Sequence, residues 1–182
     1  MADRRNNPSS FAGPLAEGTV IPTMLGGQVV VRRLLGSGAQ GHVYTALYNG
    51  RPKALKWYRP GVFADRDKFV RNLRGNIMKG SPTDEFLWPQ DMTVMVGGTF
   101  GCVMDLCPEG YFAPDDYFNR RPGARFPSYR RAIDACLGVV HAFRILHNEG
   151  YSYQDISGGN FFIHPMTVSL SCVPRYATQL LG

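Results

Sequence analysis

The chain has 182 residues, of which 44% are hydrophobic, and 20 Lys and Arg against 14 Asp and Glu give a formal net charge of +6. This apolar content supports a folded core and excludes an intrinsically disordered chain. The length fits one domain, or one lobe and part of another. We expect no membrane partner, because no apolar run reaches the length of a bilayer span.

The excess of basic residues is spread along the chain. Part of it falls near the N-terminus and in residues 66–79, and part in Arg120, Arg121, Arg125, Arg130 and Arg131. Without a dense basic block, this pattern favours an ordinary solvated surface over a nucleic-acid or phosphate partner. We therefore expect no nucleic-acid partner.

The cysteines and the N-terminus bear on the compartment. None of the four cysteines forms a C-x-x-C pair or a zinc spacing: Cys102, Cys107, Cys136 and Cys172. They are interpreted as small hydrophobes in a reducing environment. The arginines at the N-terminus are followed by no apolar segment typical of a secretory signal. The predicted location is the cytoplasm.

The first half of the chain predicts an antiparallel sheet. Residues 1–27 are rich in Pro, Gly, Asn and Ser and predict a flexible lead-in. Asn49-Gly50 predicts a type I′ hairpin turn, because both residues tolerate a positive φ. Three strands are expected, at Val29–Leu35, His42–Tyr48 and Arg51–Trp57.

The remaining pattern predicts one inserted helix, two more strands and then helices. A helix over 65–79 carries apolar residues at helical spacing and ends at Gly80-Ser81-Pro82. Strands are expected at Met92–Val96 and Phe100–Met104, a short helix from Pro114, and a long helix over Tyr129–Asn148 capped by Gly150. The fold class is α+β: a five-stranded antiparallel sheet with one helix, followed by an incomplete helical lobe.

Three glycines, Gly36, Gly38 and Gly41, form a G-x-G-x-x-G pattern. In dinucleotide-binding units such glycines lead from a strand into a helix, whereas here they lead from a strand into a strand. The setting suits a hairpin whose backbone N–H groups approach phosphates, and a plain glycine-rich turn is the alternative. Lys56, on the next strand, favours the phosphate interpretation, because it can serve as a point charge beside the loop.

The glycine pattern and the strand that carries Lys56, together with a third motif later in the chain, resemble the protein-kinase signature set. The third is Tyr153-Gln154-Asp155-Ile156-Ser157-Gly158-Gly159-Asn160, which keeps the aspartate and the asparagine of the family's catalytic loop, five positions apart. The sequences Phe86-Leu87-Trp88-Pro89 and Tyr151-Ser152-Tyr153-Gln154-Asp155-Ile156-Ser157 resemble those of a bacterial kinase-like group. The chain is thus similar to Ser/Thr-type protein kinases, truncated after the catalytic loop.

The resemblance implies ATP and Mg²⁺ as cofactors and a protein as substrate. For the nucleotide it implies that Val43 and Ala54 sandwich the adenine and that the hinge, 105–107, binds its edge through the Asp105 carbonyl and the Cys107 N–H. Met104 would be the gatekeeper. The implied nucleotide-binding residues are Gly36, Gly38, Gly41, Val43, Ala54, Lys56, Met104, Asp105 and Cys107.

For the chemistry, the resemblance implies that Asp155 accepts or orients the proton of a substrate hydroxyl. Asn160 would hold a magnesium ion through its amide oxygen. A simple turn is the alternative for this loop, because Asp, Ser, Gly and Asn are all turn formers.

The chain departs from the family in several places. Tyr153, Gln154 and Ser157 replace the family's His, Arg and Lys, so activation by loop phosphorylation is not expected. No acid lies between Asp67 and Asp84, where a partner of Lys56 is expected, so we expect this lysine to be held loosely. Residues 161–182 contain no Asp or Glu, although the family supplies its D-F-G metal aspartate there.

The predicted organisation has five parts: a lead-in over 1–27, a sheet lobe over 28–104, the hinge 105–107, a partial helical lobe over 108–164, and an atypical tail over 165–182. The abrupt change of the tail after Pro165 raises the hypothesis that the native reading frame differs there. Three functions remain open: an impaired protein kinase, a nucleotide-binding pseudokinase that acts as an interaction module, and a small-molecule phosphotransferase. The sequence indicates no oligomeric state.

Overall fold

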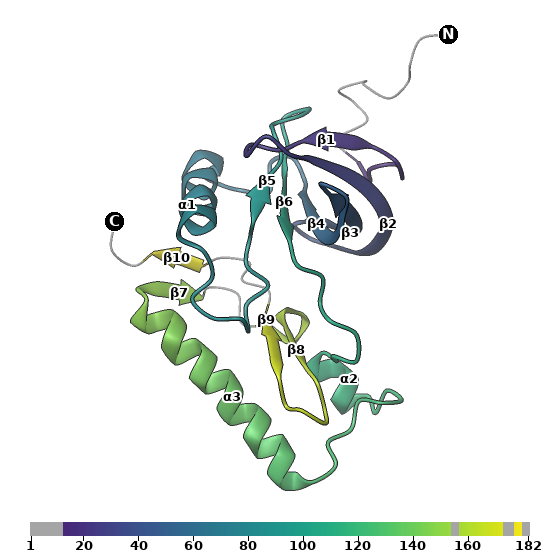
Figure 1. Ribbon diagram of the computed structural model, residues 1–182, viewed down its shortest axis with the longest axis vertical. Coiled ribbons are helices and arrows are strands. Elements are labelled where there is room, and N and C mark those ends of the chain that lie inside the picture. The colour runs from purple at the N-terminus through teal and green to yellow at the C-terminus, as the bar shows by residue number, and fades with distance from the viewer. Residues whose placement is uncertain (1–12, 154–156, 173–176, 180–182) are drawn as a thin grey trace. The chain divides into compact units, whose positions relative to one another are not determined.

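The computed structural model describes residues 13–153, 157–172 and the backbone of 177–179. The chain divides into two compact units (Figure 1). The first contains the chain up to Lys79 together with Pro89–Leu106, and the second contains Gly80–Trp88 and the chain from Cys107 onward. Among the helices of the described residues, none has both the length and the apolar character that a bilayer span requires.

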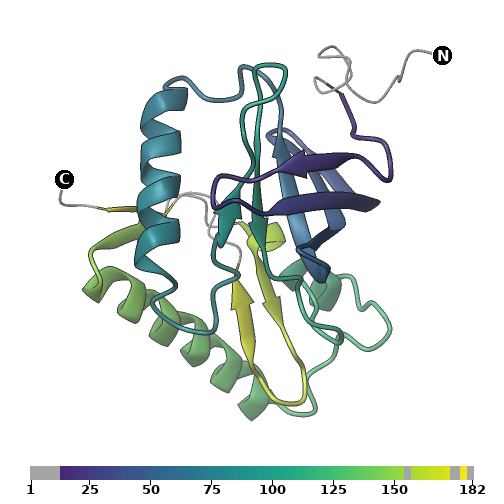
Figure 2. The same cartoon turned by 45° about the horizontal axis from the view of Figure 1, so that its top comes forward.

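The first unit is built on a six-stranded antiparallel sheet in the order β1-β2-β3-β4-β6-β5 (Figure 2). Helix α1 (Arg66–Lys79) belongs to the same unit and contacts β5. The antiparallel sheet with one helix is therefore confirmed, with six strands in place of the predicted five. The strands are β1 (Val20–Pro22), β2 (Gln28–Gly38), β3 (Gly41–Tyr48), β4 (Arg51–Tyr58), β5 (Asp91–Met92) and β6 (Gly101–Met104).

The sixth strand, β1, lies where the composition predicted a flexible lead-in. It pairs antiparallel with β2, Ile21 opposite Val29, and both side chains are fully buried. A turn at Gly26, with φ 82°, returns the chain into β2. A strand of three residues that ends in proline is too short to give a periodic signal, so the pattern of the sequence did not reveal it.

The predicted hairpin turn between β3 and β4 is confirmed. Asn49 and Gly50 have φ values of 49° and 79°, as a type I′ turn requires. Tyr48 pairs with Arg51 on either side of it, and the ladder then runs without a shift to Gly41 opposite Tyr58. The turn thus fixes the register that places Val43 opposite Lys56.

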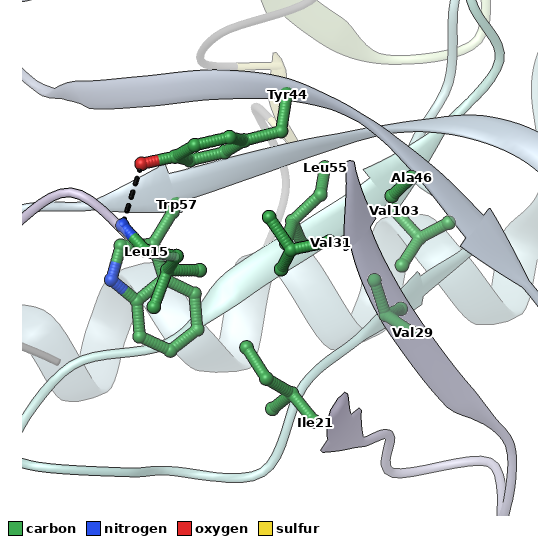
Figure 3. Packing of buried hydrophobic residues seen from close by; sticks show 9 residues of the cluster. All are labelled: Leu15, Ile21, Val29, Val31, Tyr44, Ala46, Leu55, Trp57 and Val103. Carbon is green, nitrogen blue, oxygen red and sulfur yellow. Dashed lines mark hydrogen bonds between the residues drawn. The ribbon is translucent and has the colours of Figure 1, made fainter. Parts of the chain in front are cut away.

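The core of the first unit lies on one face of the sheet. Side chains alternate between faces along a strand, so Leu55 and Trp57 point to the same side of β4. They pack with side chains of neighbouring strands that point to the same face of the sheet (Figure 3). The cluster consists of Leu15, Ile21, Val29, Val31, Tyr44, Ala46, Leu55, Trp57 and Val103.

A second group of apolar side chains connects α1 to the sheet of the first unit. The rings of Phe63 and Phe69 stack with their centroids 3.9 Å apart, and Tyr58 meets both rings edge-on. Phe100 lies against the same cluster. The helix ends where predicted, because Gly80 takes a positive φ of 82° that few other residues adopt.

The second unit contains more β structure than the expected helical lobe. Its helices are α2 (Pro114–Phe118), α3 (Tyr129–Asn148) and the 3₁₀ turn η3 (Gly158–Asn160). Two small antiparallel sheets accompany them, one pairing β10 (Ala177–Gln179) with β7 (Tyr151–Tyr153) and one pairing β8 (Phe161–Ile163) with β9 (Leu170–Cys172). The long helix has the predicted bounds, and Gly150 follows it with φ 78°.

Residues 80–88 fall inside the predicted sheet lobe, yet they pack with the second unit. The Leu87 N–H donates to the Cys172 carbonyl, and the Cys172 N–H donates to the Glu85 carbonyl, each at 2.7 Å. Phe86 and Trp88 are buried against residues of α3, β7, β8 and β9. Two large apolar side chains within three residues make this segment part of that core rather than a free connection.

The atypical tail is partly ordered into this core. Phe161 pairs with Cys172 and Ile163 with Leu170, so the hairpin that follows the catalytic loop extends to Cys172. Leu170 and Cys172 are both buried. The atypical sequence after Pro165 therefore begins inside the β8–β9 hairpin, and the pairing of the two strands continues through it.

Gly41→Ala should destabilise the protein strongly, because a Cβ on residue 41 would lie 2.0 Å from the Trp57 carbonyl oxygen. We expect a loss of at least about 2 kcal/mol in the free energy of unfolding, measured by urea denaturation. Gly38→Ala is the matched control, since nothing lies within 4 Å of a Cβ there, and it should change stability by no more than about 1 kcal/mol. Equal effects of the two substitutions would contradict this packing argument.

Candidate functional site

The face of the sheet opposite the core collects the predicted nucleotide-binding side chains of the first unit. Val43 on β3 pairs with Lys56 on β4, and Ala54 pairs with Met104 on β6. Cross-strand partners share a face, and Ala54 and Lys56 share one because they lie two residues apart. Since Leu55 and Trp57 occupy the core, this alternation places the predicted set on the other side.

The glycine loop connects β2 to β3 beside this face. Gly36 lies opposite Val43, and Gly38 lies opposite Gly41. A Cβ on Gly36 or Gly38 would meet nothing within 4 Å, whereas Gly41 is required by its approach to β4. Packing therefore explains one glycine of the pattern, and the other two leave open space in which a ligand can approach the backbone.

Lys56 is held at this loop. Its side chain is buried, and its Nζ donates a hydrogen bond of 3.0 Å to the Gln40 Oε1, from the turn between Gly38 and Gly41. The ammonium also lies 5.2 Å from the centre of the Tyr58 ring, within range of a cation–π interaction. The loose lysine that the sequence predicts is thus tied to the glycine loop itself, by a neutral amide.

Opposite Lys56 on β6 stands a second buried polar group, Cys102. Burial raises the pKa of its thiol, and the Tyr58 hydroxyl lies 3.4 Å from its sulfur. The thiol is therefore neutral beside the ammonium of Lys56 on the same face of the sheet. A lysine ammonium is a point charge that can bind phosphate oxygens.

The predicted hinge spans the chain boundary between the two units, which lies between Leu106 and Cys107. In the first unit the Asp105 carboxylate is bonded on both sides, by the Lys53 ammonium and by a 2.6 Å hydrogen bond from the Gln90 Nε2. These bonds fix the end of β6. Cys107 lies in the second unit, where burial raises the pKa of its thiol to about 11 despite a hydrogen bond with Ser171.

The second unit contains the residues predicted to form a catalytic loop. In the chain they follow the long helix α3, which ends at Asn148, and the strand β7. Asp155 lies outside the described residues. Asn160 is fully buried in η3, where its Nδ2 donates to the Ser157 Oγ at 2.9 Å and its N–H donates to the Ser157 carbonyl at 3.0 Å. These two bonds orient its amide.

Asp115 lies beside the predicted catalytic-loop residue Gly158, a proximity that the sequence did not reveal. It lies in the first turn of α2, and a Cβ placed on Gly158 would be 3.1 Å from its Oδ1. Phe112, just before α2, exchanges backbone hydrogen bonds of 3.0 and 2.9 Å with Ile163 on β8, which anchors the helix beside the loop. The sequence predicted only a short helix from Pro114, because the approach of Asp115 to Gly158 is a tertiary contact.

The donors for a magnesium ion are incomplete. The described residues contain no group of three His, Cys, Asp or Glu side chains that could hold a metal. Asn160 supplies a neutral amide oxygen, and residues 161–182 supply no carboxylate. Magnesium bound to phosphates is usually held by one or two carboxylates, so the donor set of the described residues, which do not include Asp155, does not fit that ion.

Comparisons with known proteins define the class of fold. No protein-family model matches the chain. The fold is similar to the crystal structure of the PknI kinase domain of Mycobacterium tuberculosis, with a TM-score of 0.66 and 20% identity over 88% of this chain and 62% of that one. It is also similar to vaccinia related kinase 3, with a TM-score of 0.62 and 18% identity over 91% of this chain and 53% of that one. The predicted kinase-like fold is confirmed.

A sequence relative points in the same direction. The chain is 29% identical over 161 residues to choline kinase B1 of Caenorhabditis elegans, an alignment that covers 81% of this chain and 38% of that protein. The chain therefore spans less than two thirds of each of these proteins. The fold and this relative thus both lead to kinases, one by structure and the other by sequence.

The reactivity of the thiols tests whether Cys107 and Cys172 are less exposed than Cys136. Cys136 is exposed on α3, whereas burial raises the pKa of Cys107 to about 11 and that of Cys172 to about 12, from an ordinary value of 9.0. The thiolate is the reactive form, so a rise of two units lowers reactivity about 100-fold at pH 8. Iodoacetamide should label Cys136 first, as read by peptide mass spectrometry.

In urea all four cysteines should react at similar rates, which serves as the control. Labelling of Cys107 in the native protein as fast as that of Cys136 would show that the hinge thiol is not buried in solution.

Proposed function

We propose that this chain binds ATP as the nucleotide-binding part of a kinase-type phosphotransferase and transfers the γ-phosphate to Ser or Thr hydroxyls of protein substrates. The observation that supports this most directly is the convergence, on the face opposite the core, of the open glycines of the β2–β3 loop with Lys56. A hairpin whose Gly36 and Gly38 leave the backbone open, beside a buried lysine, suits a phosphate chain.

In this proposal each residue has a distinct task. Val43 and Ala54 present apolar surface to the adenine, and Met104 limits the space behind it. The backbone of Asp105 and Cys107 bonds the edge of the base. Lys56 exchanges its bond with Gln40 for one to a phosphate oxygen, which is a stronger, charge-assisted interaction.

Asp155 is the proposed catalytic residue. A carboxylate is ionised at neutral pH and can accept the proton of a substrate hydroxyl as that oxygen attacks phosphorus. Asn160, oriented by Ser157, is the proposed metal-side ligand for Mg²⁺. When bound, the ion would neutralise phosphate charge.

The incomplete donor set favours an alternative in which the chain binds nucleotide without transferring phosphate. Phosphoryl transfer depends on positioning and on neutralisation of charge by metal. Residues 161–182 contain no acid, and the residue that follows the β8–β9 hairpin is Val173. Such a pseudokinase would act as an interaction module.

The choline kinase relative favours a second alternative, a small-molecule hydroxyl as the acceptor. Protein-kinase structures show a similar fold at 18–21% identity, which does not specify the acceptor. We also propose a cytoplasmic location, supported by four free cysteines in the structure.

ATP should stabilise the protein against heat, and Lys56→Met should remove most of that effect. Ligand at about a hundredfold over its dissociation constant stabilises a protein by about 2.7 kcal/mol, read as a rise in the melting temperature. Loss of a charge-assisted bond should weaken ATP binding at least about tenfold. Lys68→Met, at an exposed position of α1, is the matched control and should keep the full shift.

A melting temperature that millimolar ATP leaves unchanged, with and without Mg²⁺, would count against nucleotide binding altogether.

Asp155→Asn should abolish phosphate transfer while leaving ATP binding intact. We expect incorporation of the labelled γ-phosphate into a generic protein substrate to fall at least about 100-fold, the usual contribution of a catalytic base. Asp84→Asn, an exposed acid outside the site, is the control. The same assay with choline identifies the small-molecule alternative, and ATP binding without turnover on either acceptor identifies the pseudokinase.

A further inference from the structure

The connection between α2 and α3 carries a concentration of positive charge that the proposed function does not use. Residues 117–133 include five arginines and no acid. All five are exposed. Three of them, Arg120, Arg121 and Arg125, line one hollow of about 830 Å³. We call this hollow, with its three arginines, the arginine hollow. The sequence alone indicated only a solvated basic surface.

The charge in the arginine hollow is largely uncompensated. Arg121 forms an ion pair with Asp116, with 3.2 Å between its Nη1 and the Oδ1. In the part of the chain that the structure describes, no carboxylate lies within 4 Å of Arg120 or Arg125. The next acid along the chain, Asp134, follows the first turn of α3. Two guanidinium groups are therefore available to an anion.

The walls of the hollow are held by specific contacts. The rings of Tyr117 and Phe126 stack with centroids 4.5 Å apart and planes 8° apart, and the Tyr117 hydroxyl donates to the Ile163 carbonyl at 2.6 Å. Ala124 is buried, and its N–H donates to the Arg121 carbonyl at 2.9 Å. These contacts fix the loop on which the arginines stand, so binding does not have to order it.

Backbone strain also marks this loop. Arg120 adopts a φ of 52°, the left-handed region that residues other than glycine seldom occupy. Asn119 and Arg121 on either side donate their N–H groups to the Asp115 and Asp116 carbonyls, each at 2.9 Å. A strained backbone persists when its surroundings over-determine it, and such positions concentrate at ligand-binding sites.

We propose that the arginine hollow binds a polypeptide segment carrying phosphorylated Ser or Thr. Guanidinium groups bind phosphate oxygens through paired, charge-assisted hydrogen bonds, and a phosphate has the charge to match two unpaired arginines. The α3 N-terminus, capped by Ser128, adds a favourable dipole at the same place. Among the rings that line the hollow, Tyr117 and Phe126 stack on each other and Tyr129 alone is exposed. Single-stranded nucleic acid is usually held by successive bases stacked on several rings, which favours a peptide over a polynucleotide.

The test compares Arg120→Gln/Arg125→Gln with a control of equal net charge, Arg32→Gln/Arg33→Gln, at exposed positions of β2. Both variants retain Arg121 and its bond to Asp116. The probe is a fluorescein-labelled glycine–alanine peptide with two phosphoserines, followed by fluorescence anisotropy. We expect the first variant to bind this probe at least about tenfold more weakly than the unmodified protein, and the control to bind within about twofold.

Three further probes decide between chemistries: the same peptide with unmodified serines, the same peptide with glutamates, and an oligouridine of similar length. Weaker binding of all three by at least about tenfold supports phosphopeptide recognition. Equal binding of the glutamate peptide, tighter binding of the oligouridine, equal losses in the two variants, or no saturable binding of the phosphopeptide would each overturn the proposal. None of these outcomes depends on ATP binding or turnover.

Discussion

The alternation of side chains along β4 is the constraint on which the first unit depends. Leu55 and Trp57 are buried in the core, so Ala54 and Lys56 must lie on the opposite face of the strand. A shift of one residue would exchange the two sets, placing an ammonium among aliphatic side chains. The hydrophobic core therefore sets the position of the candidate phosphate-binding lysine, and the Asn49-Gly50 turn sets its partner on β3.

The glycine loop follows from the same geometry. Gly41 must lack a side chain because β3 approaches the Trp57 carbonyl, whereas Gly36 and Gly38 border open space. Lys56 is bonded to Gln40 in that loop, so the charged group and the loop are already coupled. In the second unit, the bonds between Phe112 and Ile163 hold α2 beside β8, and Ser157 orients Asn160. Each unit thus fixes its own candidate residues.

Elements with strong local signals were predicted well from the sequence. The Asn-Gly turn and the bounds of α3 follow from residue types within a few positions of each other. The strand β1, the pairing of β9 with β8, and the packing of Phe86 with the second unit were missed. Each consists of a few residues that are stabilised by partners far along the chain, so no local pattern reveals them.

The sequence by itself determined the motifs: the order of strands around the glycines, the lysine two strands later, and an asparagine five positions after an aspartate at the end of a long helix. These depend on spacing, which the chain records directly. Only the tertiary structure decided which glycines are required by packing, that Lys56 contacts Gln40, that Asp115 reaches Gly158, and that three arginines line one hollow. Such contacts depend on strand register and on the approach of segments that are distant in the chain. Local spacing is compatible with several arrangements of these segments, and burial and long-range strand pairing select one of them.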